Sequence, residues 1–269
     1  MAVWQGTAPI VDRRDLAADY FLLTVDCPPI AAAAQPGQFA NLLVAGRDLC
    51  LRRPISFYGV DGGRVSMMIG VHGAGTAWLR ERAVGEPLDL LGPLGGRGLS
   101  LTPGARRVAL IGGGVGIPPL HFLATRRPAD GPEMLAFVGA RSAERLLGLE
   151  AFTALGVRTI ASTDDGSAGF HGTAVAALAE VLATESIDQI LACGPTPMMR
   201  AAAELAAARG IACQVCLEAR MACGVGACLS CVVETTTDGW RRYQRVCTEG
   251  PVFDGDQILW AGLSPLCAV

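Results

Sequence analysis

Hydrophobic and polar residues alternate over short stretches in the N-terminal part of the chain, and this pattern predicts β-strands. The clearest stretches are residues 20–27, 39–46 and 64–71, which are separated by turn clusters containing proline and glycine. Short strands at this spacing are typical of a small β-barrel. One helix is expected within it, at residues 77–85, and the turn-rich residues 93–104 mark its end.

From residue 106 onwards the pattern changes to apolar strands that alternate with helices. Strands are expected at residues 134–141, 157–163 and 188–195, after a first strand that runs into a glycine-rich turn. Helices are expected at residues 171–183 and 197–210. Alternating strands and helices imply a doubly wound parallel sheet with helices on both faces. The fold class is therefore α/β plus β, with a β-barrel domain (1–104), an α/β domain (105–210) and a small cysteine-rich module (211–269).

The composition adds limits to this picture. A length of 269 residues leaves room for two ordinary domains and a small one, and 51% hydrophobic against 17% charged residues allows a large core. The chain has no uncharged run long enough to span a bilayer, and its N-terminus lacks the features of a signal peptide, so we expect a cytoplasmic protein without membrane contact. A net charge of −3 gives no indication of nucleic-acid binding.

Four cysteines near the C-terminus carry the strongest chemical signal. Cys223, Cys228 and Cys231 follow the spacing C-x4-C-x2-C, and Cys247 comes after a further fifteen residues. This is the plant-type ferredoxin pattern, in which four thiolates hold a 2Fe–2S cluster. Two glycines inside the pattern suit a loop that must wrap around a cluster, since glycine accepts unusual backbone angles at little cost. The spacing therefore predicts a one-electron centre with these four cysteines as metal ligands.

Two other interpretations of the four cysteines remain open. A zinc site usually contains two CxxC pairs, and here only Cys228 and Cys231 are so spaced. Disulfides suit small secreted domains rather than a chain without a signal sequence. The remaining cysteines are expected to be free thiols, and these are Cys27, Cys50, Cys193, Cys213, Cys216 and Cys267.

A glycine-rich turn after the first strand of the α/β part is a candidate phosphate site. Its glycines are Gly112, Gly113, Gly114 and Gly116, and a helix opens directly after them. Backbone N–H groups at the start of a helix attract phosphate, although the turn does not complete the G-x-G-x-x-G fingerprint. Tight packing alone would also explain such a turn.

A second candidate lies at the end of a later strand, at Cys193, Gly194 and Pro195. Ligands of open α/β sheets bind beyond the carboxyl ends of the strands, where this segment and the glycine turn are both expected. Cys193 is equally well explained as a buried apolar thiol.

Two further motifs fall in the barrel part. The first is the run Arg53, Pro54, Ile55 and Ser56, in which the arginine suits a phosphate and the serine suits a flavin edge. The second is the pair Gly75-Thr76. Alone, each has an ordinary explanation as a solvated surface charge or as a turn with a helix cap.

Taken in order, these motifs resemble the ferredoxin-reductase superfamily over nearly the whole chain. The order is RPIS, G-x-G-T, GPLG, GGGVGIPP, CGPTPMM and CGVGACLSC. Within the superfamily the chain is most similar to electron-transfer subunits of type B dihydroorotate dehydrogenase, a similarity to which Glu218 and Met221 before the cluster also contribute. The small subunit of electron-bifurcating ferredoxin–NADP oxidoreductase often has aspartate at the first cysteine, so Cys223 favours the dihydroorotate branch.

The resemblance implies three cofactors and a partner. FAD would lie in the barrel, a nicotinamide dinucleotide in the α/β domain, and a 2Fe–2S cluster at the contact with an FMN-containing catalytic subunit, in a heterotetramer of two plus two. The FAD contacts that it implies are Arg53, Pro54, Ile55, Ser56, Met68, Ile69, Gly70, Gly75 and Thr76. The dinucleotide would lie near Gly112, Gly113, Gly114, Gly116, Cys193, Gly194 and Pro195. NAD is expected rather than NADP, although Arg141, Ser142 and Arg145 follow the second strand, where a 2′-phosphate would lie.

Two departures from the family pattern leave room for a different redox partner. Relatives often carry a larger or charged residue where Gly70 stands, and residues 95–98 differ from the usual ending of GPLG. A reductase for an oxygenase, a hydrogenase or another dehydrogenase is therefore the alternative function, and a zinc-stabilised binding module is a third.

The chemistry agrees with the resemblance. NADH gives two electrons as a hydride while a cluster accepts one at a time, and a flavin between them accommodates both. We expect no catalytic side chains, and a structural or surface role for His72, His121 and His171. Apolar residues at 221–229 and 260–269 are expected at the partner interface, unless they close the core of the module itself: Leu229, Trp260, Leu263 and Leu266.

Overall fold

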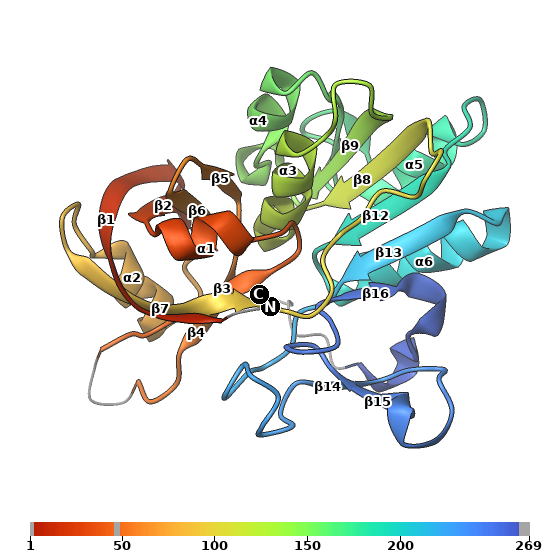
Figure 1. Ribbon diagram of the computed structural model, residues 1–269. Helices are drawn as coiled ribbons and strands as arrows, with labels where there is room; N and C mark the ends of the chain where they lie inside the picture. Colours follow the sequence, from red (N-terminus) through yellow and green to blue (C-terminus); the bar gives the residue numbers. More distant parts are fainter. Residues whose placement is uncertain (1–2, 46–48, 264–269) are drawn as a thin grey trace.

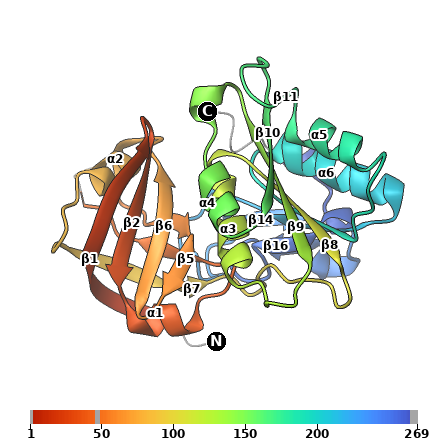
Figure 2. The same cartoon turned by 90° about the horizontal axis from the view of Figure 1, so that it is seen from above.

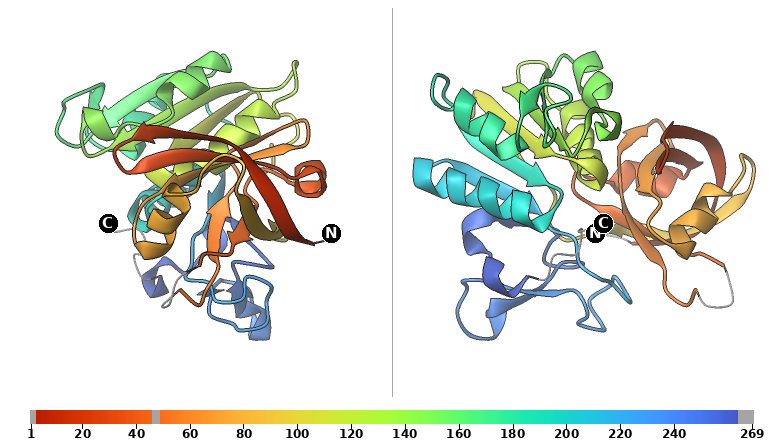
Figure 3. Two further views of the ribbon diagram at one scale, coloured as in Figure 1. Left: turned by 90° about the vertical axis from the view of Figure 1, so that its left-hand side faces the viewer. Right: turned by 180° about the vertical axis from the view of Figure 1, so that it is seen from behind.

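The computed structural model describes residues 3–45 and 49–263 of the chain (Figure 1). Within these residues two seven-stranded sheets stand side by side, and a two-stranded hairpin lies below them (Figures 1 and 3). Cys267 and Leu266, which the sequence singled out, lie outside the described residues. Among the described helices, none is long and apolar enough to cross a membrane.

The N-terminal sheet is antiparallel and curls into a half-barrel, as predicted (Figure 2). Its strand order is β4-β3-β7-β1-β2-β6-β5. The elements are β1 (Trp4–Ala17), β2 (Tyr20–Asp26), α1 (Pro28–Ala33), β3 (Phe39–Leu42), β4 (Arg53–Ser56), β5 (Gly59–Asp61), β6 (Arg64–Gly70), α2 (Ala74–Arg80) and β7 (Pro87–Leu94). Alternate side chains of β6, namely Val65, Met67 and Ile69, face the inside of the curl and are fully buried there. This is the period-two pattern on which the strand prediction depended.

The helix expected at residues 77–85 begins earlier, at Ala74. Its first turn is fixed by Thr76, whose hydroxyl oxygen accepts a hydrogen bond from the backbone N–H of His72 at 2.9 Å. The prediction started from the apolar run and missed this local cap.

The second sheet has the order β11-β10-β9-β8-β12-β13-β16, and all its pairs are parallel except the one that β16 makes with β13. Its strands are β8 (Arg107–Gly112), β9 (Glu133–Ala140), β10 (Arg158–Thr163), β11 (Phe170–His171), β12 (Gln189–Cys193), β13 (Ala212–Cys216) and β16 (Val252–Asp254). The helices are α3 (Ile117–Thr125), α4 (Leu149–Ala154), α5 (Ala174–Val181) and α6 (Thr196–Arg209). The helix expected from residue 171 thus begins at Ala174, because His171 forms the short edge strand β11.

The two faces of this sheet are covered by different helices. Val108 and Leu110 of β8 pack in one apolar cluster with residues of α3 and α4. Ala109 and Ile111 pack in another with residues of α5 and α6. The predicted doubly wound arrangement, with helices on both faces, is confirmed (Figure 2).

The sheet continues beyond residue 210, since both β13 and β16 belong to it. A cut between residues 105–210 and 211–269 would therefore pass through this sheet. The division into three domains stays a prediction.

The cysteine-rich part contains the hairpin of β14 (Val232–Glu234) and β15 (Tyr243–Arg245). Its core is continuous with that of the second sheet, because Cys231 and Cys247 share an apolar cluster with Phe39 of the half-barrel and Phe253 of β16. Trp260 and Leu263, which we considered for a partner interface, pack against this cluster and so help to close the core. Leu229 does not, since 61% of it is exposed.

His121 of α3 lies at the contact between the two sheets. Its ring stacks on Tyr58, with the ring centroids 3.9 Å apart, and its Nδ1 donates a hydrogen bond to the carbonyl oxygen of Tyr58 at 2.9 Å. Burial lowers the pKa of His121 because the charged imidazolium would lose its hydration. The histidine therefore has the structural role that was expected of it.

We expect the stability difference between wild type and His121→Phe to depend on pH. The unfolded chain takes up a proton at this histidine near pH 6.5 and the folded protein only at lower pH, so acid removes stability from the wild type alone. At about pH 8 the variant should be less stable by about 1 kcal/mol, the value of the lost hydrogen bond. Denaturant unfolding should show this gap shrinking below about pH 6.5. A gap that stays constant down to about pH 5 would contradict the assignment.

Candidate functional site

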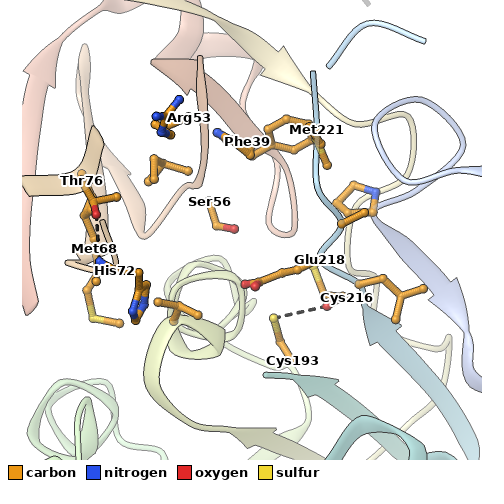
Figure 4. A pocket seen from close by; sticks show the side chains of 18 residues that line it. Phe39, Arg53, Ser56, Met68, His72, Thr76, Cys193, Cys216, Glu218 and Met221 are labelled. Carbon is orange, nitrogen blue, oxygen red and sulfur yellow. Dashed lines mark hydrogen bonds between the residues drawn. The ribbon is translucent and has the colours of Figure 1, made fainter. Parts of the chain in front are cut away.

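A pocket of about 220 Å³ lies where the half-barrel, the second sheet and the cysteine-rich part meet (Figure 4). Segments far apart in the sequence line it, as is usual for a cofactor site between domains. The half-barrel contributes Phe39, Arg53, Pro54, Ile55, Ser56, Met68, Ile69, Gly70, His72 and Thr76. The remaining lining residues are Val115, Cys193, Cys216, Leu217, Glu218, Ala219, Met221 and Pro251.

Eight of the nine residues predicted to contact FAD line this pocket. The exception is Gly75, and its place is explained by Arg53. A Cβ atom at position 75 would overlap with the guanidinium group of Arg53, so a glycine is needed for the arginine to lie over the start of α2. Arg53 donates a hydrogen bond to the carbonyl oxygen of Leu51 and forms no ion pair among the described residues, so its charge is available for a phosphate.

The departure at Gly70 has a steric explanation. A Cβ atom at this position would lie 2.6 Å from Nε2 of His72 and 3.1 Å from Cγ1 of Val115. Val115 belongs to the glycine turn of the second sheet, so the small residue at position 70 lets the two sheets approach each other. Gly70 therefore suits the geometry of this pocket.

The departure at residues 95–98 is also explained by packing, and none of these residues lines the pocket. A Cβ atom at Gly96 would overlap with the carbonyl oxygen of Thr248. Next to it, Arg97 donates two hydrogen bonds to the carboxylate of Asp254, at 2.6 and 2.9 Å. The segment is therefore shaped by its contact with the turn before β16.

The glycine turn follows β8 as predicted, and close packing requires part of it. A Cβ atom at Gly113 would lie 2.5 Å from the carbonyl oxygen of Gly139, and one at Gly116 would overlap with that of Cys193. Gly114 is different, because its φ of +53° is the left-handed conformation and the hydroxyl of Tyr20 lies 3.0 Å from where its Cβ would be. The turn itself does not line the pocket except through Val115.

Cys193, Gly194 and Pro195 lie where β12 ends and α6 begins. Only Cys193 of the three lines the pocket, and it is 1% exposed. Its thiol donates a weak hydrogen bond to the carbonyl oxygen of Cys216 at 3.6 Å. Cys193 is therefore a buried thiol that also forms part of the pocket wall, and its part in dinucleotide binding stays a prediction.

Several lining residues were not predicted as site residues. Phe39 and Pro251 carry no chemical signature, and only the fold brings them to the pocket. Glu218 and Met221 had been noted as part of the motif before the cluster, and Figure 4 shows the carboxylate of Glu218 pointing into the pocket, as does the hydroxyl of Ser56. Glu218 lies two residues after the end of β13, and this position was a signal that could have placed it there.

The four predicted cluster cysteines gather beside this pocket in two pairs. In the first pair, Sγ of Cys223 accepts a hydrogen bond from the backbone N–H of Cys228 at 3.4 Å, and Sγ of Cys228 accepts one from that of Cys223 at 3.5 Å. In the second pair, the buried thiols of Cys231 and Cys247 interact with each other. Among the described residues, no three His, Cys, Asp or Glu side chains are arranged to hold a single metal ion. A cluster of two irons takes two thiolates on each iron, and two pairs of thiols fit that need.

The surroundings of the two pairs differ. Hydrogen bonds from Ser230 and Cys223 lower the pKa of the exposed Cys228 to about 6, because they stabilise its thiolate. Burial, together with the neighbouring Cys231, raises the pKa of Cys247 to about 12. Deprotonation of Cys247 therefore requires a compensating positive charge, which the irons of a cluster would provide.

Comparison with known proteins agrees with this geometry. The family model described as the iron–sulfur cluster binding domain of dihydroorotate dehydrogenase B matches residues 218–259. The electron transfer subunit of dihydroorotate dehydrogenase B (NAD(+)) from Shouchella clausii is 37% identical over 262 residues, which cover 95% of this chain and 98% of the relative. The subunit of the same name from Enterococcus faecalis is 36% identical over 260 residues, with the same coverage of 95% and 98%.

Among solved structures, that of an NADH-dependent reduced ferredoxin-NADP oxidoreductase is similar over 95% of this chain and 91% of its own. It aligns with a TM-score of 0.85 at 28% identity. The curled antiparallel sheet, the parallel sheet and the cysteine-rich part thus define an electron-transfer protein of the ferredoxin-reductase class. The identity to the two bacterial subunits over nearly the whole chain is more specific. This chain belongs to the family of dihydroorotate dehydrogenase B electron transfer subunits.

Proposed function

We propose that this chain is an oxidoreductase subunit that passes electrons between NAD(H) and a partner flavoprotein through FAD and a 2Fe–2S cluster, in dihydroorotate oxidation for pyrimidine biosynthesis. One observation carries the proposal. Residues 217–221 contribute to the wall of the pocket, and two residues later the same segment reaches Cys223. A cofactor in the pocket and a cluster on the cysteines would therefore be neighbours.

FAD would supply the step between two-electron and one-electron transfer, and the residues of this chain bind and orient it. Arg53 offers its charge to the pyrophosphate, and the hydroxyl of Ser56 is positioned for a hydrogen bond to the flavin. The apolar side chains of Ile55, Met68 and Ile69, which line the pocket, would exclude water from the ring. The wider contact set is the one predicted from the sequence, with Gly75 acting through the position of Arg53.

The dinucleotide would bind at the carboxyl ends of β8 and β12. The pyrophosphate is assigned to Gly112, Gly113, Gly114 and Gly116, and the nicotinamide to the neighbourhood of Cys193, Gly194 and Pro195. Cys193 is the one of these residues that reaches the pocket, so a nicotinamide beside it would face a flavin bound there. We propose NAD as the dinucleotide because the two bacterial relatives carry NAD(+) in their names.

We expect Gly114→Val to slow the reduction of bound FAD by NADH by at least about tenfold, since a side chain there blocks close backbone approach to the pyrophosphate. The variant also places a β-branched residue at positive φ, which has a cost of its own. Gly62→Val is the matched control, because Gly62 has a φ of +55° with no atom within 4 Å of its would-be Cβ. Stopped-flow kinetics should show slowing in Gly114→Val alone, and equal kinetics in both variants would contradict the placement.

The cluster ligands are assigned to Cys223, Cys228, Cys231 and Cys247, two on each iron. The exposed side of the cluster site carries apolar side chains that a partner protein could cover. Leu229, between two of the cysteines, has a φ of 59° and an exposed side chain, and Val225 on the same loop is 48% exposed. An exposed apolar residue at positive φ beside a redox centre is suited to a docking contact. We infer that the catalytic subunit, which carries FMN, covers this loop in a heterotetramer of two plus two.

The experiment for this function uses the purified chain with its cofactors under anaerobic conditions. Stoichiometric NADH should bleach the flavin absorbance and then produce the EPR signal of a reduced 2Fe–2S cluster, whereas NADPH should act much more slowly. A chain that contains zinc in place of iron, or a cluster that NADH does not reduce, would contradict the proposal.

A further inference from the structure

Strand β3 has two faces with different neighbours. Ala40 and Leu42 point into the half-barrel and are part of its core. Phe39 instead lines the pocket of Figure 4, which we propose for FAD and call the flavin pocket, and it packs in the same apolar cluster as Cys231 and Cys247. Because side chains alternate along a strand, Asn41 lies on the same side as Phe39. This side of β3 therefore faces both the pocket and the cysteine-rich part.

Asn41 is the residue of β3 that contacts the loop of residues 223–228, which we call the cluster loop. Its Nδ2 donates a hydrogen bond to the carbonyl oxygen of Cys223 at 3.4 Å. Gly224, which has a φ of +70°, approaches so closely that a Cβ there would overlap with Nδ2 of Asn41. The contact joins residues 182 positions apart in the sequence.

The amide of Asn41 lowers the stability of the folded protein at this position. The side chain is 1% exposed, and its Oδ1 has no hydrogen-bond partner among the described residues. A buried polar atom without a partner destabilises a protein, while an apolar side chain of similar size would avoid the cost. The pairing of β3 with β7 is irregular between Phe39 and Asn41, but the extra residue lies on β7, and β3 keeps its regular alternation.

We propose that Asn41 is a positioning residue that fixes the distance between the flavin pocket and the cluster loop, and thereby the rate of electron transfer between the two cofactors. The inference rests on the proposed function, since it requires FAD in the pocket and a cluster on the cysteines. Phe39 and Asn41 are two residues apart on one rigid strand. A hydrogen bond from that strand to the backbone of Cys223 holds the first cluster ligand at a set distance from the pocket wall.

A second side chain holds the cluster loop at a different residue and provides a control. Arg245 donates a hydrogen bond to the carbonyl oxygen of Gly226 at 2.9 Å, and its guanidinium is held in place by Glu249. Arg245 lies two residues before Cys247, so this contact joins ligand-bearing segments to each other. Its loss should loosen the cluster itself, whereas the loss of the Asn41 contact should free the cluster loop from β3 and leave the cluster bound.

The test compares Asn41→Leu, Asn41→Gln and Arg245→Gln with the wild-type chain carrying its cofactors. Leucine has the same branching and the same number of heavy atoms as asparagine, and its partner across the sheet is the apolar Leu91, so a normal fold is expected. Glutamine keeps the amide but extends the side chain by one methylene. Asn41→Gln therefore provides a second test if Asn41→Leu does not fold. Rapid mixing with NADH measures flavin reduction and cluster reduction separately, and hydrogen exchange reports on the cluster loop.

Asn41→Leu and Asn41→Gln should keep the iron content of wild type and reduce FAD at a rate within about twofold, because the dinucleotide site is untouched. Cluster reduction should slow by about tenfold or more, since reaction rates fall steeply when reacting groups are displaced. Exchange at residues 223–228 should become faster. Arg245→Gln should instead lose iron.

Cluster reduction at the wild-type rate, or unchanged exchange in the cluster loop, would overturn the proposal. Loss of iron in the Asn41 variants would also overturn it. Asn41 would then be needed to bind the cluster, rather than to set the distance between the cluster loop and the flavin pocket. Failure of the proposed function is a separate result, since the wild-type chain itself would then show no cluster reducible by NADH.

Discussion

Cys231→Ser is expected to abolish the visible and EPR signals of the iron–sulfur cluster while FAD remains bound. Cys231 is 2% exposed and interacts with Cys247, so no other thiol among the described residues is placed to substitute for it. A serine hydroxyl is a poor replacement, since soft thiolate ligands are what select iron–sulfur clusters. The pocket that we propose for FAD does not include Cys231, so FAD content should stay near that of wild type.

Cys27→Ser is the matched control for this result. Cys27 is also 2% exposed, but it lies in the core of the half-barrel far from the cluster loop. Both variants bury a hydroxyl in place of a thiol, so a general loss of stability should affect them alike. Iron and sulfide analysis should show depletion in Cys231→Ser only. A full complement of iron and sulfide in that variant would disprove the ligand assignment.

Arg53→Ala should be purified with much less FAD than wild type. A hydrogen bond between a guanidinium and a phosphate is charge-assisted, and its removal costs about 1.5–3 kcal/mol, which weakens binding by about 10- to 150-fold. The arginine has no carboxylate partner among the described residues, so the substitution leaves no buried charge behind. The expected effect is therefore on the flavin rather than on the fold.

Arg64→Ala serves as the control, because Arg64 is an exposed arginine at the start of the neighbouring strand β6 and lies outside the pocket. Isothermal titration of the apoprotein with FAD would measure both affinities. We expect weaker binding in Arg53→Ala alone. An FAD affinity equal to that of wild type would show that Arg53 does not hold the cofactor.

The parts of the structure that follow from local patterns were predictable from the sequence. The period-two alternation at residues 64–71 predicted a strand that differs by one residue from β6, since one face of that strand is buried. The spacing of the four cysteines likewise identified residues that the fold brings together. In both cases the signal lies within a few tens of residues.

The parts that depend on tertiary contacts were not predictable in this way. Strands β13 and β16 complete the second sheet from within the cysteine-rich part, and nothing local indicates that Val252 pairs beside Cys216. Phe39 and Pro251 enter the pocket only because the half-barrel meets the turn before β16. The need for a small residue at position 70 is likewise explained only by the contact with Val115 of the other sheet.

The apolar C-terminal residues illustrate the same limit. Trp260 and Leu229 are equally apolar in the sequence, yet one packs against the core and the other is exposed at positive φ beside the cysteines. The pattern alone could not separate them. The backbone conformation of Leu229 was the deciding observation for the docking surface.

Electrons from NADH should leave this chain through its cluster to a flavoprotein partner. The most direct measurement is to co-express the chain with the catalytic dihydroorotate dehydrogenase subunit of the same organism. The purified complex is then mixed with NADH under anaerobic conditions. We expect a stable complex in which the FMN of the partner becomes reduced, and in which Cys231→Ser stops this reduction while FAD is still reduced. A chain that stays separate from that subunit and leaves its FMN oxidised would contradict this route of electron transfer.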